Sequence, residues 1–167
     1  ADRAADLGDD DIDVVARQTG FDDRDRMRIQ VALEEALLNA VVHGNLEVSS
    51  RLRELEGDLF EQAIAERKGL EPYRSRRVTL NATYNHSEAR FTIRDEGPGF
   101  DVDKVRNPTE DDAIALASGR GILLMRSFMD EVTYNNRGNE VSMLKRRSSS
   151  LSPHAEVTEA ACGAAVP

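Results

Sequence analysis

Residues 31–43 (VALEEALLNAVVH) are apolar almost all the way around a helix, yet they carry one polar row. At about 100° per residue, the apolar side chains cover one broad side of this helix and extend around the other. Glu35, Asn39 and His43 follow the i, i+4, i+8 spacing and form the polar row. A helix this apolar is expected to be buried, and an unpaired buried carboxylate is costly. The row should therefore face a polar cavity, a ligand or an ion.

The order of the other patterns predicts a sheet with helices on one face. We expect helices over residues 11–18, from Asp22 or Asp23 to His43, over 49–68 and over 121–130. We expect two hairpins, one from residues 77–84 and 89–94 and one from 131–134 and 139–145. This order differs from alternating βαβ units. The predicted fold class is α+β, a two-layer sandwich of a mixed, mostly antiparallel sheet with helices on one face.

The length and charge restrict the kinds of protein that this chain can be. Its 167 residues fit one domain, which we place at residues 11–147, between a flexible N-terminus (1–10) and a disordered tail (148–167). A net charge of −9 argues against nucleic acid as a general partner. The single Cys162 permits no internal disulfide, and no apolar run approaches the roughly 18 residues of a membrane span. We therefore predict a cytoplasmic protein without a membrane or nucleic-acid partner.

A glycine-bearing segment, residues 95–100 (DEGPGF), follows directly after a predicted strand. Glycine lets the backbone turn sharply or approach a flat ligand closely. Asp95, at the strand end, can accept hydrogen bonds from an amino group. The alternative interpretation is an ordinary turn rich in Asp, Gly and Pro.

A second glycine-bearing segment, residues 118–121 (SGRG), precedes a predicted helix. Backbone N–H groups at a helix start form an anion site, and paired glycines let a phosphate come close. Arg120 could add a charge-assisted contact to a phosphate. The alternative is a flexible helix entry. The segment contains neither a P-loop pattern nor a full dinucleotide fingerprint.

Each residue of the polar row also has a structural alternative. Glu35 could pair with an arginine in the core, and His43 is better explained as a capping or packing residue at the helix end. Asn39 is harder to explain structurally, because a neutral amide on an apolar helix needs partners. A hard cation bound together with phosphates would supply them.

Three motifs therefore occur in a fixed order: Glu35-x-x-x-Asn39 on a helix, Asp95-x-Gly97-x-Gly99 at a strand end, and Gly119-x-Gly121 at a helix start. Together they resemble the GHKL ATPase superfamily, which includes gyrase-type ATPases, histidine-kinase catalytic domains and anti-sigma-factor serine kinases. The sequence is most similar to the last group, through residues 35–43 (EALLNAVVH), 119–125 (GRGILLM) and 129–132 (MDEV). The resemblance covers about residues 11–145.

This resemblance implies a Bergerat ATP-binding fold, with ATP and Mg²⁺ as ligands, and it suggests a role for each motif residue. Glu35 would be the general base that activates a water or a substrate serine. Asn39 would coordinate Mg²⁺ at the phosphates. Asp95 would accept the adenine amino group, and Gly97 and Gly99 would shape the base pocket.

The resemblance also implies that Gly119 and Gly121 wrap the phosphates and that residues 103–118 form a lid over ATP. The implied activity is an ATP-dependent serine/threonine kinase that phosphorylates an anti-sigma antagonist. A sigma factor is another candidate partner. Related kinases are often dimers, so a homodimer is also considered.

The sequence departs from the family pattern at three places. We find no strand before the first helix, and Glu140 occupies the place in the last strand that commonly holds an adenine-binding Thr. Residues 48–70 form a helical insertion, which we expect to cover one edge of the domain or to contact a partner. Two other functions stay open: a nucleotide-sensing module without turnover, and a detached histidine-kinase catalytic domain.

Overall fold

The computed structural model describes residues 16–17, 19–54, 57–103, 120–147 and 160–166. Its helical elements are α2 (Asp23–Leu38), the π-helix η1 (Asn39–Asn45), the 3₁₀ turns η2 (Ser50–Glu54) and η3 (Tyr73–Ser75), α3 (Leu59–Lys68) and α6 (Arg120–Phe128). Its strands are β1 (Val78–Tyr84), β2 (Glu88–Asp95), β3 (Glu131–Tyr134), β4 (Glu140–Arg146) and β5 (Ala160–Val166). None of these helices is long and apolar enough to cross a membrane.

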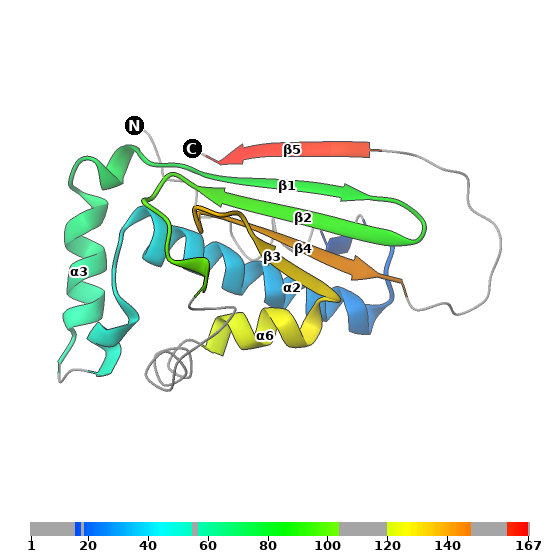
Figure 1. The fold of residues 1–167 in the computed structure, drawn as a ribbon, viewed down its shortest axis with the longest axis horizontal. Helices are drawn as coiled ribbons and strands as arrows, with labels where there is room; N and C mark the ends of the chain where they lie inside the picture. Colours follow the sequence, from blue (N-terminus) through cyan, green and yellow to red (C-terminus); the bar gives the residue numbers. More distant parts are fainter. Residues whose placement is uncertain (1–15, 18, 55–56, 104–119, 148–159, 167) are drawn as a thin grey trace.

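One sheet forms the first layer, with strand order β3-β4-β2-β1-β5, and α2 and α6 lie side by side on one face of it (Figure 1). The four described strand pairings are all antiparallel. The α+β, two-layer prediction is therefore confirmed, and both predicted hairpins are present. No parallel pair occurs among the described strands, although the sequence suggested a mixed sheet.

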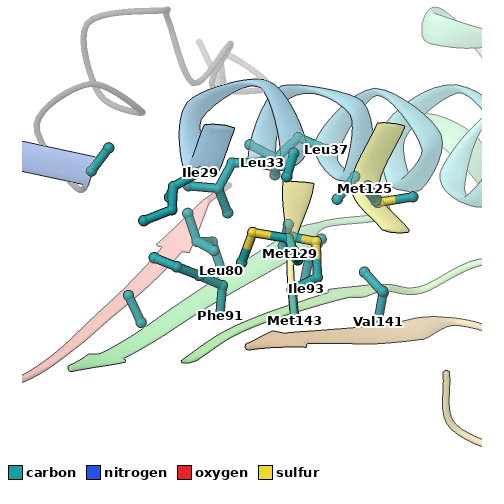
Figure 2. Packing of buried hydrophobic residues seen from close by; sticks show 14 of the residues in the cluster. Ile29, Leu33, Leu37, Leu80, Phe91, Ile93, Met125, Met129, Val141 and Met143 are labelled. Carbon is teal, nitrogen blue, oxygen red and sulfur yellow. The ribbon is translucent and has the colours of Figure 1, made fainter. Parts of the chain in front are cut away.

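The core lies between the sheet and the two helices (Figure 2). Strand alternation buries one face of the central strands, where Phe91 of β2 stands opposite Met143 of β4. From the helix layer, Ile29 and Leu33 of α2 and Met125 of α6 are fully buried against this face. The period of two in the strands and the helical spacing in α2 thus meet in one core.

The helix that carries the polar row is less buried than its composition predicts. It begins after Asp22, whose carboxylate accepts a hydrogen bond from the Asp25 N–H at 2.8 Å, as expected for an N-cap. However, Leu38 is 44 % exposed and Val41 is 39 % exposed. In a two-layer fold only the sheet-facing side of a helix is covered, so burial all around the helix was a wrong expectation.

The insertion differs from the single helix predicted over residues 49–68. The structure divides it into η2 and α3, and Gly57 between them has φ +88. An α-helix cannot continue through this left-handed conformation, which glycine adopts readily. A small apolar cluster of Val42, Leu46, Val48 and Phe60 packs the insertion against the end of the long helix.

The tail prediction is wrong for part of its length. Residues 160–166 form β5, which pairs with β1 from Val78 opposite Val166 to Tyr84 opposite Ala160. Without β5, that edge of β1 would leave its backbone N–H and C=O groups unpaired. Such pairing does not require the alternation of large apolar residues by which strands are predicted from sequence. Residues 1–10 and 148–159 lie outside the described residues, and of the predicted helix 11–18 only Ala16 and Arg17, which are helical, are described.

A buried ion pair joins α2 to β4. Lys145 Nζ of β4 lies 3.6 Å from Asp25 Oδ1 of α2 and 3.7 Å from Asp130 Oδ1. Arg28 Nη1 also contacts Asp25 Oδ1, at 3.1 Å. Because Lys145 and Asp25 are both buried, loss of one partner leaves a charge in a poorly solvated site.

We expect Lys145→Met to lower the free energy of unfolding by about 2 kcal/mol, less than for an isolated buried pair because Arg28 still compensates Asp25. Urea denaturation measures this change. Lys68→Met, at an exposed position on α3, is the control and should change stability by less than about 0.5 kcal/mol. Equal stability of Lys145→Met and wild type would show that the pair does not stabilise the fold.

Candidate functional site

Two of the three predicted motifs meet where α2 passes the start of α6. Gly121, the second residue of α6, is buried. A Cβ at Gly121 would lie 2.5 Å from Glu35 Oε2 and 3.4 Å from Asn39 Nδ2. The structure therefore brings Glu35 and Asn39, both half-buried, directly against the N-terminal end of α6. A helix start beside a carboxylate and an amide can hold an anion next to a proton acceptor.

The long helix changes its hydrogen-bonding pattern at Asn39. The Asn39 N–H donates to the carbonyls of both Ala36 and Glu35, and the Leu46 N–H donates to the Val41 carbonyl, five residues back, at 2.9 Å. This π-helix has more residues per turn than the α-helix before it, so the i, i+4 row does not continue straight through it. Single turns of π-helix are frequent at functional sites, and the sequence gives no signal for this one.

His43 leaves the polar row because of this change. Its Nδ1 lies 2.5 Å from the Val48 carbonyl oxygen, and its ring lies 6.5 Å from the Phe60 ring, centroid to centroid. The interpretation of His43 as a packing residue at the helix end is confirmed. The polar row that faces α6 consists of Glu35 and Asn39 alone.

Asp95 ends β2 in a buried position and is 7 % exposed. Its Oδ1 accepts a hydrogen bond from the Gly97 N–H at 2.9 Å. Burial raises the pKa of Asp95 above its ordinary value of 3.8, and the Gly97 hydrogen bond and the charge of Arg137 lower it only in part. A further donor, such as an exocyclic amino group, would stabilise the ionised carboxylate.

The end of η1 packs closely against the turn that follows Asp95. A Cβ at Gly44 would lie 2.4 Å from Asp95 Cγ, and a Cβ at Gly97 would lie 2.2 Å from the Gly44 carbonyl oxygen. Both positions therefore need glycine so that the two backbones can touch. The sequence marked Gly44 only as the end of a helix, whereas here it lies inside η1 against the predicted adenine-binding carboxylate.

Gly99 packs against the backbone of the turn between β3 and β4. Its φ is +81, and a Cβ there would lie 1.9 Å from the Arg137 carbonyl oxygen. The Phe100 N–H donates to that oxygen at 3.1 Å, and Arg137 Nη2 donates to the Gly97 carbonyl at 3.1 Å. The turn between β3 and β4 thus fixes residues 97–100. Arg137 is a site-supporting residue that the sequence did not indicate.

Two buried asparagines, missed in the sequence, hold the strand end on either side of Asp95. Asn139 Nδ2 donates to the Asp95 carbonyl, and Asn45 Oδ1 accepts from the Glu96 N–H, each at 2.9 Å. They are 3 % and 5 % exposed. In this hairpin Asn139 contacts the Asp95 backbone, and the next residue, Glu140, pairs with Arg94 in the sheet. The only sequence signal was an asparagine next to a glycine at each place.

Part of the predicted site lies outside the described residues: Gly119 and, apart from Asp103, the whole lid of residues 103–118. Arg120 begins α6, and its side chain is not described. Within the described ranges, no group of three or more His, Cys, Asp and Glu side chains could hold a metal ion by itself.

The sequence comparisons agree with this geometry. A family model for the histidine kinase-like ATPase domain matches residues 10–145, which is most of the chain. No curated protein gives a significant match. The matched range contains Glu35, Asn39, Asp95, Gly121 and all the contacts described above. The chain therefore belongs to the ATP-binding histidine kinase-like ATPase domains of the GHKL superfamily, whose Bergerat fold its two-layer structure matches.

Proposed function

We propose that this protein is an ATP-dependent serine/threonine-protein kinase of the anti-sigma-factor type, which phosphorylates a partner protein such as an anti-sigma antagonist. The observation that carries the proposal is the contact of Glu35 and Asn39 with Gly121 at the start of α6. A helix start suits the phosphates, and Glu35 lies beside it as a proton acceptor. ATP binding alone would not need a carboxylate at this place.

The nucleotide would extend from Asp95 to the start of α6. Asp95 would accept the adenine amino group, and the first N–H groups of α6 would bind phosphate oxygens. The residues also fit a magnesium ion in their chemistry, because the Asn39 side chain lies at the start of α6 and its amide oxygen is a ligand that hard cations accept. Asn39 would hold Mg²⁺ together with the phosphates, as hard cations with few protein ligands are usually held. When bound, Mg²⁺ neutralises part of the phosphate charge.

The transfer step needs one proton acceptor. The hydroxyl oxygen of a partner serine or threonine attacks the γ-phosphorus, and a P–O bond forms. The bond from the γ-phosphorus to the β–γ bridging oxygen breaks, and ADP leaves with that electron pair. The hydroxyl proton passes to the Glu35 carboxylate, which therefore acts as the general base.

Incubation with labelled ATP, Mg²⁺ and a candidate antagonist tests this proposal. We expect label on the antagonist, and we expect none when its acceptor serine is replaced by alanine or when EDTA removes the metal. Nucleotide-dependent binding of the partner without any transfer would contradict kinase activity and favour a nucleotide-sensing module. Isothermal titration with ATP and Mg²⁺ in parallel reports whether the nucleotide binds at all.

A further inference from the structure

Two arginines bind backbone carbonyls at the C-terminal end of η1. One lies in the insertion, and the other lies in the segment that connects the insertion to β1. Arg67 of α3 donates from Nη1 to the Leu46 carbonyl at 2.7 Å and to the Glu47 carbonyl at 2.6 Å. Arg76 donates from Nη1 to the Asn45 carbonyl and to Glu47 Oε1, both at 2.7 Å. Three consecutive carbonyls, those of residues 45–47, therefore bind guanidinium groups.

These contacts supply hydrogen-bond donors to backbone carbonyls at the end of a helix. The last carbonyls of a helix have no partner within it, and side-chain donors at its C-terminal end can bind them. The chain also turns sharply here, since Glu47, with φ 55, is the only non-glycine residue of the described chain with a positive φ. The ring of Tyr73 lies 5.2 Å from the guanidinium carbon of each arginine and keeps both in place.

Residues 44–47 also contact the turn around Asp95, where the adenine base is predicted to bind. Asn45 Oδ1 accepts from the Glu96 N–H, one residue beyond Asp95, and Gly44 packs against the Asp95 carboxylate. A continuous series of contacts thus runs from α3, which lies at one end of the molecule, through residues 44–47 to Asp95 (Figure 1).

We propose that Asn45 is a positioning residue for base recognition and that Arg67 of the insertion and Arg76 of the segment before β1 hold it in place. The proposal rests on the ATP binding through Asp95 argued above. Asn45 fixes the N–H of Glu96 and so sets the direction of the Asp95 carboxylate, which must meet an amino group along a narrow range of angles. The insertion thereby determines how strictly the site selects a 6-amino purine.

Isothermal titration of MgATP and of MgITP, which has a carbonyl in place of the 6-amino group, tests this proposal. Wild type should prefer ATP. In Asn45→Ala, we expect this preference to fall by about tenfold or more, while the affinity for ITP stays within about twofold. A purely structural role would instead weaken both nucleotides together, because they share the phosphates and the ribose.

Arg67→Ala provides an independent test if Asn45→Ala does not fold. We expect it to lower the preference for ATP by about threefold or more. Arg74→Ala is the matched control, because the side chain of this exposed arginine in η3 pairs, among the described residues, with Glu71 alone and its loss should leave the preference unchanged. An unchanged preference in the folded variants, or a parallel loss of both nucleotides, overturns the positioning role. Failure of wild type to bind ATP would instead overturn the proposed function itself.

Discussion

Asp95→Asn is expected to weaken ATP binding on the order of 100-fold, while the protein without ligand becomes no less stable than wild type. The carboxylate is the predicted acceptor for the adenine amino group, and asparagine would turn an N–H donor toward that amino group or lose the hydrogen bond from Gly97. The free energy of unfolding without ligand should stay the same or rise, because asparagine removes a buried charge. Its side-chain oxygen can still accept the hydrogen bond from the Gly97 N–H. A binding residue that destabilises its own fold is a common feature of functional sites.

The pH dependence of this stability difference follows from the raised pKa of Asp95. A carboxyl group whose pKa is higher in the folded state binds its proton more tightly there than in the unfolded chain. Its contribution to stability is therefore most favourable below the unfolded pKa, near 3.8, and is lost as the pH rises through the folded pKa. The advantage of Asp95→Asn over wild type should grow across this range and then level off.

Thermal unfolding of both proteins from pH 4 to pH 8, with ATP titrations at neutral pH, measures both effects. Asp58→Asn is the control, because Asp58 precedes α3 at the surface and caps it with no side-chain hydrogen bond. This variant should change neither ATP affinity nor the shape of the pH profile. An Asp95→Asn protein that binds ATP like wild type would exclude Asp95 as the base-recognising residue, and a lower stability at neutral pH would mean that its charge is well compensated.

Local patterns predicted α2, α6 and the four strands β1 to β4. Alternation located β1 and β2 within two residues of their ends, and the Asp22 cap located the start of α2, because these features depend on neighbours in the sequence. The same reasoning selected Glu35 and Asn39, since a polar pair on an apolar helix is unusual wherever it occurs. Their contact with Gly121 is what the three-dimensional structure adds.

The supports of the site could not be predicted in this way. Asn45 and Asn139 act through backbone groups of residues 96 and 95, which are 51 and 44 positions away along the chain. Nothing local distinguishes them from asparagines in ordinary turns. The pairing of β5 with β1 likewise joins segments distant in sequence, whereas the π-helix that turns His43 away is a local change for which the sequence gives no signal. Sequence patterns therefore identify the residues that carry unusual chemistry, but not those that hold them.

Glu35→Gln should lower the rate of phosphate transfer to the partner by about 10²–10⁴-fold and leave ATP affinity within about threefold of wild type. Glutamine keeps the shape and the polarity that face Gly121 but cannot accept the hydroxyl proton. Single-turnover transfer of labelled phosphate measures the chemical step, so that slow product release does not hide the change.

The neighbouring Glu34 supplies the control, because Glu34→Gln makes the same chemical change one residue away. Its Oε1 accepts a hydrogen bond from Gln30 Nε2 on the same helix at 3.1 Å, and we place it in no catalytic role. Glu34→Gln should therefore transfer phosphate at the wild-type rate. Equal rates for Glu35→Gln and wild type would eliminate Glu35 as the base. In that case the carboxylate would act on the bound nucleotide only through its charge at the start of α6, and the proton would leave through another group or through water.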